Sequence, residues 1–523
     1  MAKPRDRRRR RRRAANGDVT SLAIKKGTLC QEYDNPRDGK RLRYSWQNLP
    51  EDIWCHIHSR MTLQDAARAA CVSRAFLRSW RFHPNLIFTE ETPSLEQNAR
   101  RKGDKSCAFA STVDHILENH SGIGVKRLKI MMDSFCNTKI TSLNSWFQKA
   151  ITPGIEEITL APPSNYNGDY SFPFSLVFDR SRSSIRYLEL TNCTIHPTVS
   201  PGCLTSLTEL CLRMVHIKDE ELGCLLSMSC ALEDLQLMYC REIRSLKIPS
   251  MLERLSHLTI SGCYNLQMVE CKAPNLSTFS FTGGIVQLSL GESSQVKSLY
   301  MACSSVPNFT YNSIPKLPYI VPNIRNLTLS FINEGINTPT IAARFLHLKH
   351  LEINLYANSL PPGYDYFSLI SFFDASPFLE SFILRVHQVG MKHISIFEDD
   401  SHMRQTSEHQ HASLKNVMIL GFCSAKSMVE LACHILENAT KLKSITLDTV
   451  LDAEDEDNIG RCCTNSTRKI GKCTRLTREM ILEAERGSVA IERYILGAVS
   501  SGVELTVRGA CSWCHDIERA KSP

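Results

Sequence analysis

Residues 185–190 read IRYLEL, in which one apolar residue is followed three and five positions later by two more. The same phrase stands at residues 125–130 (VKRLKI) and 155–160 (IEEITL). Between residues 125 and 442 the mean spacing of the phrase is about 26 residues, a period typical of solenoid repeat proteins. The ten further starts are Leu207, Leu232, Leu255, Leu276, Val296, Ile324, Leu348, Leu379, Leu414 and Leu442.

Each phrase predicts a short β-strand, because successive side chains of a strand point to opposite faces of a sheet. The apolar residues at positions i+3 and i+5 then point into a core, and those at i+2, i+4 and i+6 point to the opposite, concave face. One such unit cannot bury its own apolar side chains, whereas stacked units form a parallel sheet over one continuous core. Residues 125–410 therefore predict an α/β solenoid of the leucine-rich-repeat kind.

Three cysteines fit the same phrase. Cys193, Cys240 and Cys263 each fall eight residues after a repeat start, where the side chain turns inward at the bend after the strand. A small thiol suits such a buried position, so we interpret these cysteines as core residues. CSWCH at 511–515 has the spacing closest to a zinc site, but CC at 462–463 is not a second well-spaced pair. The sequence therefore predicts no metal and no cofactor.

Residues 44–90, before the repeats, predict three short helices. NLPED at 48–52 combines a polar cap, a proline and two acids, which is typical of a helix start. Ile53 and Ile57 lie four residues apart and therefore share one face of that helix. Asp65 can cap a second helix. A core this small needs a neighbour or a partner for stability.

This region resembles the F-box. The resemblance depends on the combination of LPEDI at 49–53, DAAR at 65–68, VSR at 72–74 and Trp80. It implies that the module docks onto a Skp-type adaptor and, through it, a cullin. The adaptor-binding residues that it implies are Leu49, Pro50, Ile53, Ile57, Val72 and Trp80. Residues 91–124 are expected to be a linker to the repeats.

The C-terminal region, residues 411–523, continues the repeats. An apolar stripe at 426–439 predicts a helix, Thr477 can cap another, and VELTV at 503–507 alternates like a closing strand. LKNV at 414–417, together with the helix that follows, resembles the FBD region of plant F-box proteins. The resemblance implies that this region extends and caps the solenoid and that no chemistry resides in it.

The net charge of +8 comes from the N-terminus. Residues 1–13 hold nine basic side chains and one acid, and the rest of the chain has 53 basic and 53 acidic residues. A neutral body argues against a broad nucleic-acid-binding face. Residues 1–43 are expected to be a disordered tail, and a location in the nucleus, the cytoplasm or both is expected. The candidate import signal, which could equally be a solvated tail without an address, consists of Arg7, Arg8, Arg9, Arg10, Arg11, Arg12 and Arg13.

The sequence lacks the common motifs of catalysis and membrane insertion. No P-loop motif and no Gly-x-Ser-x-Gly elbow occur, and no run of 18 apolar residues predicts a membrane-spanning helix. His402, His409 and His411 lie in a polar stretch that we interpret as a solvated loop. We therefore predict no catalytic residues.

The order of F-box, repeats and FBD-like end resembles a plant family of substrate receptors in Skp–cullin–F-box ubiquitin ligases. The resemblance implies a non-catalytic chain that binds a protein substrate. Two alternatives are a repeat scaffold that degrades nothing and a protein tethered to nucleic acid by its arginine tail. Arg and Tyr are frequent interface hot spots, so the concave face is the candidate substrate surface, with a solvated sheet face as the alternative. Its candidate residues are Tyr187, Glu189, Glu209, Arg213, Asp234, Gln236, His257 and Tyr300.

Overall fold

The structure of the 523-residue chain is a computed structural model. It divides into two units, residues 1–50 and 51–523, and only the second is described below apart from Pro50. The expected tail at 1–43, Arg7 to Arg13 and Leu49 lie outside the described residues. The residues described are 50–89, 92, 102–132, 140–163, 170–181, 184–197, 204–284, 286–291, 295–303, 314–331, 341, 343–356, 360–398, 402–404, 410–451 and 476–511.

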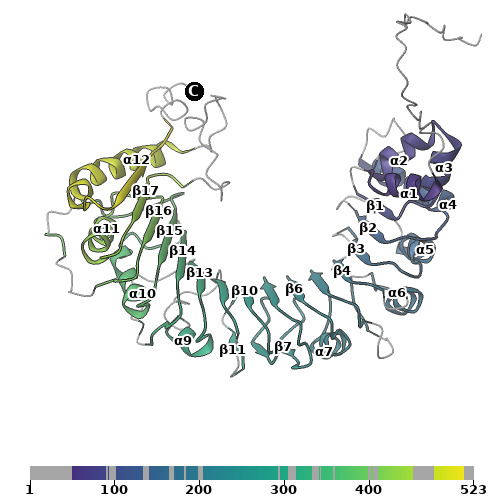
Figure 1. Ribbon diagram of the computed structural model, residues 1–523, viewed down its shortest axis with the longest axis horizontal. Helices are drawn as coiled ribbons and strands as arrows, with labels where there is room; N and C mark the ends of the chain where they lie inside the picture. The colour runs from purple at the N-terminus through teal and green to yellow at the C-terminus, as the bar shows by residue number, and fades with distance from the viewer. Residues whose placement is uncertain are drawn as a thin grey trace, which may run out of the picture. The chain divides into compact units, whose positions relative to one another are not determined.

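A single parallel sheet runs through the second unit (Figure 1). Within the described residues it has fifteen strands, and each pairs with the next in register. In order they are β1 (Asn85–Phe88), β2 (Arg127–Met131), β3 (Glu157–Ala161), β4 (Tyr187–Thr191), β5 (Glu209–Arg213), β6 (Asp234–Met238), β8 (His257–Ser261), β10 (Thr278–Gly283), β12 (Ser298–Cys303), β13 (Asn326–Phe331), β14 (His350–Tyr356), β15 (Ser381–His387), β16 (Asn416–Leu420), β17 (Ser444–Asp448) and β18 (Glu504–Arg508).

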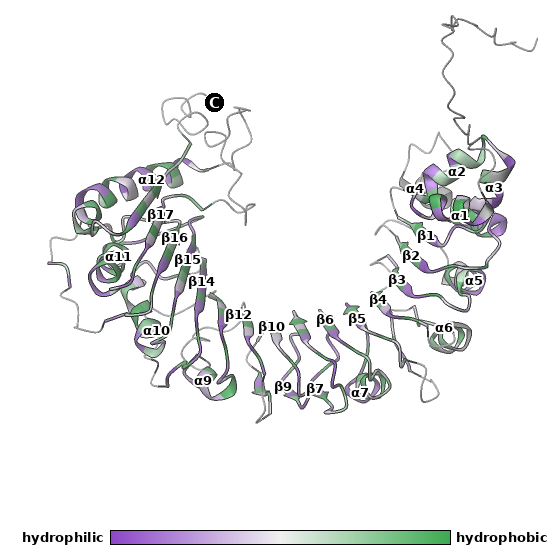
Figure 2. Cartoon of the chain, in the orientation of Figure 1, coloured by the Kyte–Doolittle hydropathy of each residue, from purple (hydrophilic) through white to green (hydrophobic). Residues whose placement is uncertain are grey.

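The predicted repeats are confirmed as strands. Each of the thirteen phrase starts lies two residues before a strand, β2 to β17, and the closing strand predicted at 503–507 is β18. The i+3 and i+5 residues are buried, as Leu188 and Leu190 of β4 illustrate. Figure 2 shows the resulting alternation of hydrophobic and hydrophilic residues along the strands. The predicted α/β solenoid with a parallel sheet is therefore correct.

The helices lie on one side of this sheet (Figure 1). A repeat with enough residues between strands folds its return segment into a helix, which buries an apolar stripe against the sheet. These return elements are α5 (Ile140–Ala150), α6 (Phe174–Ser181), α7 (Asp219–Ser227), η3 (Ile314–Lys316), α9 (Leu317–Ile320), η5 (Tyr366–Leu369), α10 (Ile370–Ala375) and α11 (Lys426–Asn438). After β17 come α12 (Arg478–Ala490), η6 (Ile491–Ile495) and η7 (Leu496–Ala498), before β18.

The shortest repeats have a second sheet instead of helices. The starts from Leu232 to Val296 are only 20 to 23 residues apart. Their return segments form β7 (Ser245–Ile248), β9 (Met268–Cys271) and β11 (Gln287–Ser289), which pair in parallel in the order β11-β9-β7. An extended chain covers more distance per residue than a helix, so strands fit where a helix would need more residues. None of the thirteen predicted strands corresponds to these three.

The N-terminal end differs from prediction in two places. The expected linker at 91–124 contains an 18-residue helix, α4 (Lys102–Asn119), which packs beside α5 through a 2.7 Å hydrogen bond from Trp146 Nε1 to Asp114 Oδ1. The sheet also begins earlier than residue 125, because β1 lies inside the interval expected for the F-box and pairs with β2. The connection between the two regions is therefore structured.

Three helices precede β1: α1 (Glu51–Ser59), α2 (Leu63–Ala70) and α3 (Arg74–Arg81). The second is capped by Thr62, whose Oγ1 accepts a 3.1 Å hydrogen bond from the backbone N–H of Asp65. The prediction that Asp65 caps this helix is wrong, since Asp65 lies in its first turn. Thr477, by contrast, caps α12 as predicted. Among the described residues, no helix has the length and apolar character needed to cross a membrane.

Candidate functional site

The open face is our name for the side of the main sheet that carries the i+2, i+4 and i+6 side chains, opposite the helices. Strand register aligns Tyr187, Glu209, Asp234 and His257 in one row across β4, β5, β6 and β8. A second row passes from Glu189 through Cys211 to Gln236, and Arg213 begins a third. Adjacent strands lie about 4.8 Å apart, so seven of the eight predicted residues form one surface. Tyr300, on β12, lies two strands beyond β8.

Acidic side chains dominate one part of the open face. This acidic patch consists of Glu157, Glu189, Glu209 and Asp234. Glu189 accepts hydrogen bonds from the Tyr187 hydroxyl (3.0 Å) and from Thr159 Oγ1 (3.3 Å). Gln236 donates to Asp234 Oδ2 at 3.1 Å, whereas Asp234 Oδ1 is buried without a hydrogen-bond partner among the described residues. Of the four, Glu157 is neutralised, by an ion pair with Arg127.

Arg213 is the basic side chain at the centre of this region. Its Nη2 lies 3.2 Å from the sulfur of Met238, and it forms no ion pair with any described residue. Burial, followed by the charge of Glu189, raises the pKa of Tyr187, so its hydroxyl stays protonated as a hydrogen-bond donor. The same two causes raise the pKa of Cys211 to about 11, which leaves a thiol rather than a nucleophilic thiolate. The acidic patch and Arg213 can therefore bind charged and polar groups, and no activated nucleophile accompanies them.

A second part of the open face is aromatic. The aromatic patch consists of Tyr300, Tyr356 and His387, and the last two rings stack with centroids 4.2 Å apart. Burial, then the charge of Arg385, lowers the pKa of His387, so its ring is neutral at pH 7. Sequence reasoning missed Tyr356 and His387 because β14 and β15 run two residues beyond the repeat phrase. The strand alternation itself, carried to i+8, would have found them.

Residues at the ends of two neighbouring strands, β5 and β6, also flank the open face. Met214 and Tyr239 have φ angles of 50° and 56°, in a left-handed region that bulky residues rarely adopt. Their backbone N–H groups each donate a 2.7 Å hydrogen bond to the next repeat, at Met238 O and Ser261 O, which holds this conformation in place. Their side chains are 42% and 44% exposed. Both stand at position i+7 of their repeats, directly before the cysteine position, and this position is the signal that could have identified them.

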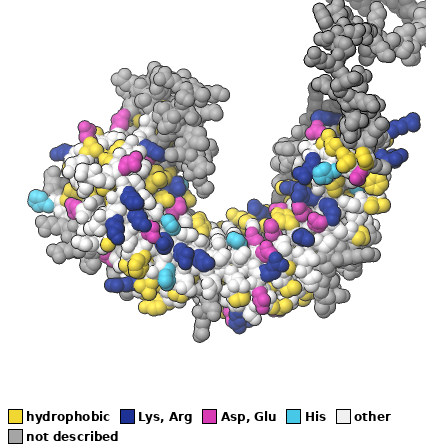
Figure 3. All heavy atoms as spheres, viewed as in Figure 1, with side chains coloured by type: hydrophobic (Ala, Val, Ile, Leu, Met, Phe, Trp, Pro, Cys, Tyr) yellow, Lys and Arg dark blue, Asp and Glu magenta, His cyan; other side chains and the backbone are white. Residues whose placement is uncertain are grey.

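The N-terminal helices carry a separate apolar surface. Ile53 is 41% and Val72 is 80% exposed, Ile57 is half-buried, and Pro50 is exposed. Figure 3 shows hydrophobic side chains gathered over this module. Trp80 requires a correction, because it is 7% exposed and belongs to the core that joins α3 to the sheet. Its ring therefore packs inside the module and leaves little surface for an adaptor.

The cysteine prediction is confirmed for the repeat positions. Cys193, Cys240 and Cys263 are buried, and the last two thiols approach the carbonyl oxygens of Leu212 (3.5 Å) and Leu237 (3.7 Å). Hydrogen bonds to strand carbonyls explain why a weak S–H donor suits this bend. Of the residues at 511–515, only the buried Cys511 is described, and 462–463 lie outside the described residues.

The histidine stretch is only partly solvated. His402 is exposed, His409 lies outside the described residues, and His411 is buried with its Nε2 2.8 Å from His434 Nε2. The interpretation of His411 as part of a solvated loop is therefore wrong. It packs between the edge of the Phe373 ring and α11, which explains its burial.

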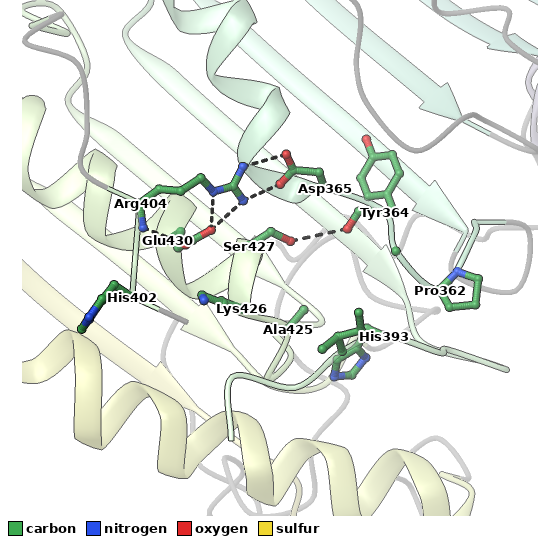
Figure 4. Close-up of a pocket in the computed structure, with 12 residues that line it drawn as sticks. Pro362, Tyr364, Asp365, His393, His402, Arg404, Ala425, Lys426, Ser427 and Glu430 are labelled. Carbon is green, nitrogen blue, oxygen red and sulfur yellow. Dashed lines mark hydrogen bonds and ion pairs between the residues drawn. The ribbon is translucent and has the colours of Figure 1, made fainter. Parts of the chain in front are cut away.

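A cavity of about 370 Å³ lies beside α11 (Figure 4). Three of its charged groups are paired with one another: Arg404 donates to both oxygens of Asp365 at 2.7 and 2.8 Å and to Glu430 Oε2 at 2.7 Å. Arg404 also lies over the Phe367 ring, 4.3 Å from its centroid. Because these charges are mutually satisfied, the Arg404 side of the cavity is a structural set of ion pairs that links the segments carrying Asp365, Arg404 and Glu430.

Comparison with known proteins agrees with this architecture. Residues 116–512 match the family described as "At1g61320/AtMIF1, LRR domain", and residues 46–88 match the F-box domain. The first match spans most of the chain, and the chain belongs to the At1g61320/AtMIF1 LRR domain family. The predicted resemblance to plant F-box, leucine-rich-repeat and FBD proteins is thereby confirmed.

Two relatives from Arabidopsis thaliana illustrate the similarity. F-box/LRR-repeat protein At5g02910 is 24% identical over 382 residues, which are 69% of this chain and 76% of the relative. Putative F-box/FBD/LRR-repeat protein At5g56810 is also 24% identical, over 416 residues that make up 76% of this chain and 88% of the relative. An F-box followed by repeats supports a substrate-adaptor role in general terms.

Proposed function

We propose that this chain is the substrate-recognition subunit of a Skp–cullin–F-box ubiquitin ligase. The observation that carries the proposal is the combination of an F-box domain, with apolar side chains exposed at Ile53 and Val72, and a long open sheet face. Exposed apolar side chains that cluster on a small helical module are typical of a protein-interaction site. The α1–α3 module binds the Skp-type adaptor, and through it a cullin.

The open face binds the substrate in this proposal. The acidic patch carries more negative charge than Arg213 can neutralise, which favours a substrate segment with basic side chains. The aromatic patch supplies large apolar contact areas of the kind that interfaces concentrate in a few residues. The transfer chemistry belongs to other subunits, so the chain contributes binding and positioning and is not itself a catalyst.

The test separates the two surfaces. Ile53→Asp places an unpaired charge in the adaptor contact, which costs several kcal/mol at an interface, and should abolish co-purification of adaptor and cullin. Ile123→Asp is the matched control, because Ile123 is 65% exposed outside the three-helix module. The replacement of Tyr187, Arg213 and Tyr300 by alanine should stabilise the substrate in cells without loss of adaptor.

Three results would contradict the proposal. Wild-type levels of adaptor and cullin with folded Ile53→Asp would show that the docking surface lies elsewhere. Unchanged substrate turnover in the triple variant would move the substrate site off the open face. A wild-type chain that brings down partners but neither adaptor nor cullin would favour the non-degradative scaffold.

A further inference from the structure

Three side chains able to bind a metal converge near the C-terminal end of the sheet. His393 lies in the loop after β15, Cys423 in the turn between β16 and α11, and Glu483 on α12. One potential ligand atom from each lies within 4.8 Å of the others. Cys423 follows His393 by 30 residues and Glu483 follows Cys423 by 60, so no short spacing motif in the sequence indicates the cluster.

Two glycines bring these segments together. Gly421 has a φ of +76°, and a side chain there would meet the carbonyl oxygen of Val386 at 2.1 Å, so the turn that carries Cys423 requires glycine. Gly487 lies one helical turn after Glu483, and a Cβ there would lie 3.0 Å from the carbonyl oxygen of Phe422. Helix α12 can therefore lie directly against the backbone of this turn.

The loop that carries His393 is held by the same turn. Ser395 forms an antiparallel β-bridge with Ala425, and Ile396 N–H donates to the carbonyl oxygen of Ser424 at 2.8 Å. In Figure 4, His393 and Ala425 lie at one end of the cavity, away from Arg404. The ligand set is thus fixed by backbone contacts on all three segments, as a built site requires.

The distances are close to those of a coordinated metal. His393 Nε2 lies 3.2 Å from Glu483 Oε1. Zinc bonded to nitrogen and oxygen at about 2.0–2.2 Å in a tetrahedron holds two such atoms on the order of 3.4 Å apart. The histidine and the carboxylate therefore already have the spacing of two ligands of one ion, and the thiol of Cys423 lies within 4.8 Å of both.

Burial and the surrounding hydrogen bonds favour a site over a chance cluster. Cys423 is fully buried, and the side chains of His393 and Glu483 are only 10% and 13% exposed. Glu483 Oε1 accepts a 2.6 Å hydrogen bond from the backbone N–H of Ser424, and the side chain of Tyr366 hydrogen-bonds to that of Cys423. Contacts of this kind orient metal ligands. The ring of His393 has its contact through Nε2, which lies 3.2 Å from Ser424 Oγ, whereas its Nδ1 is buried with no hydrogen-bond partner among the described residues.

We propose that His393, Cys423 and Glu483 form a zinc site that fastens α12 to the last repeats. A thiolate, an imidazole and a carboxylate are the ligands that Zn²⁺ takes, whereas Mg²⁺ and Ca²⁺ prefer oxygen alone. His393 lines the cavity, so water from the cavity supplies the fourth ligand. The proposal departs from the sequence prediction of no metal, and it stands independently of the proposed ligase function.

The test measures metal directly on the full chain. The purified protein should contain about one zinc per chain, and Co²⁺ in its place should give the thiolate-to-metal charge-transfer absorption of a cysteine ligand. Cys423→Ser and Glu483→Gln should each weaken zinc binding by more than the roughly 10–100-fold that outer-contact substitutions cost. Cys433→Ser is the matched control, because Cys433 is a buried thiol on the neighbouring α11.

Each result decides the question. A folded wild-type chain that binds neither Zn²⁺ nor Co²⁺ overturns the proposal, and so does zinc that persists unchanged in folded Cys423→Ser. Zinc that is lost on replacing Cys511 and Cys514 instead would place the metal at the C-terminal CSWCH sequence and would likewise overturn it. If Cys423→Ser fails to fold, two measurements still decide: the charge-transfer band of the Co²⁺-loaded wild type, and the zinc affinity of the folded Glu483→Gln variant.

Discussion

The two ends of the sheet are built in opposite ways. At the N-terminal end, the α1–α3 module leaves Ile53, Val72 and Leu77 exposed. At the C-terminal end, every residue of α11 from Met428 to Leu436 is buried, including the polar Glu430 and His434. The α1–α3 module thus keeps apolar side chains in solvent, whereas α11 covers even its polar ones, and the last helix, α12, again exposes Leu482 and Val489.

This difference indicates what each end is for. A helix that is buried all round lies inside a finished core and has no face left for a partner. A small helical module with exposed apolar side chains has surface that a partner can cover. The α1–α3 module therefore has free apolar surface and α11 has none between Met428 and Leu436, a difference that matched substitutions in the two regions can test.

The largest expected difference comes from a charge placed on each end. Leu431→Asp puts a carboxylate into the packed interior beneath α11, at a cost of more than about 4 kcal/mol. Val72→Asp places the same charge on a side chain that is 80% exposed, where surface substitutions stay within about 0.5 kcal/mol. Urea unfolding of both variants measures the difference. Equal losses of stability would mean that the N-terminal module is as closely packed as the C-terminal end.

A smaller difference is expected from one ion pair at each end. Arg404→Ala leaves the buried carboxylate of Glu430 without its guanidinium and should lower the free energy of unfolding by about 3 kcal/mol. Arg68→Ala removes an exposed i,i+3 pair with Asp65 and should cost less than about 1 kcal/mol.

Adding Glu430→Gln to Arg404→Ala should restore part of the loss, since the amide carries no charge to leave unpaired. A double variant that is less stable than Arg404→Ala by the full cost of a second independent substitution would contradict this explanation.

How much of this contrast the sequence could predict depends on how local the signal is. Each main-sheet strand from β2 to β17 has two apolar residues at fixed positions, so the phrase alone predicted all thirteen of them. The strands β7 and β9 end the same phrase, IRSLKI at 243–248 and LQMVEC at 266–271, so a local signal for them was present and was missed. β1 follows directly on Pro84 and the F-box phrase, which concealed its role as the first strand of the sheet.

The functional residues also divide into those with a local signal in the sequence and those placed by packing between distant segments. Strand alternation placed Tyr187, Glu209 and Asp234 on the open face from the sequence, because side-chain direction in a strand is a local property. The inward position of Trp80 and the convergence of His393 with Glu483 depend on packing between distant segments. No spacing rule encodes such packing, so these features needed the structure.

The smallest expected difference between the two ends is their response to pH. His58, His83 and His120 lie where the three-helix module meets the first repeats, and burial lowers the pKa of each. His58 and His120 also feel the charge of His83, while His120 Nε2 lies 2.9 Å from the backbone oxygen of His83. In the unfolded chain these rings take up protons as the pH falls below about 6.5. The folded state resists that uptake, so its stability falls as the pH drops from there toward the lowered values.

Amide hydrogen exchange at pH 7.5 and 5.5, corrected for intrinsic rates, should therefore show α1–α3 losing protection at the lower pH. Helix α12, which contains no histidine, should change less over the same interval. His83→Gln should reduce the pH dependence of the N-terminal helices, because it removes the ring that the other two histidines face. A loss of protection that is equal at both ends, or unchanged in His83→Gln, would show that these histidines do not set the pH response of the N-terminal end.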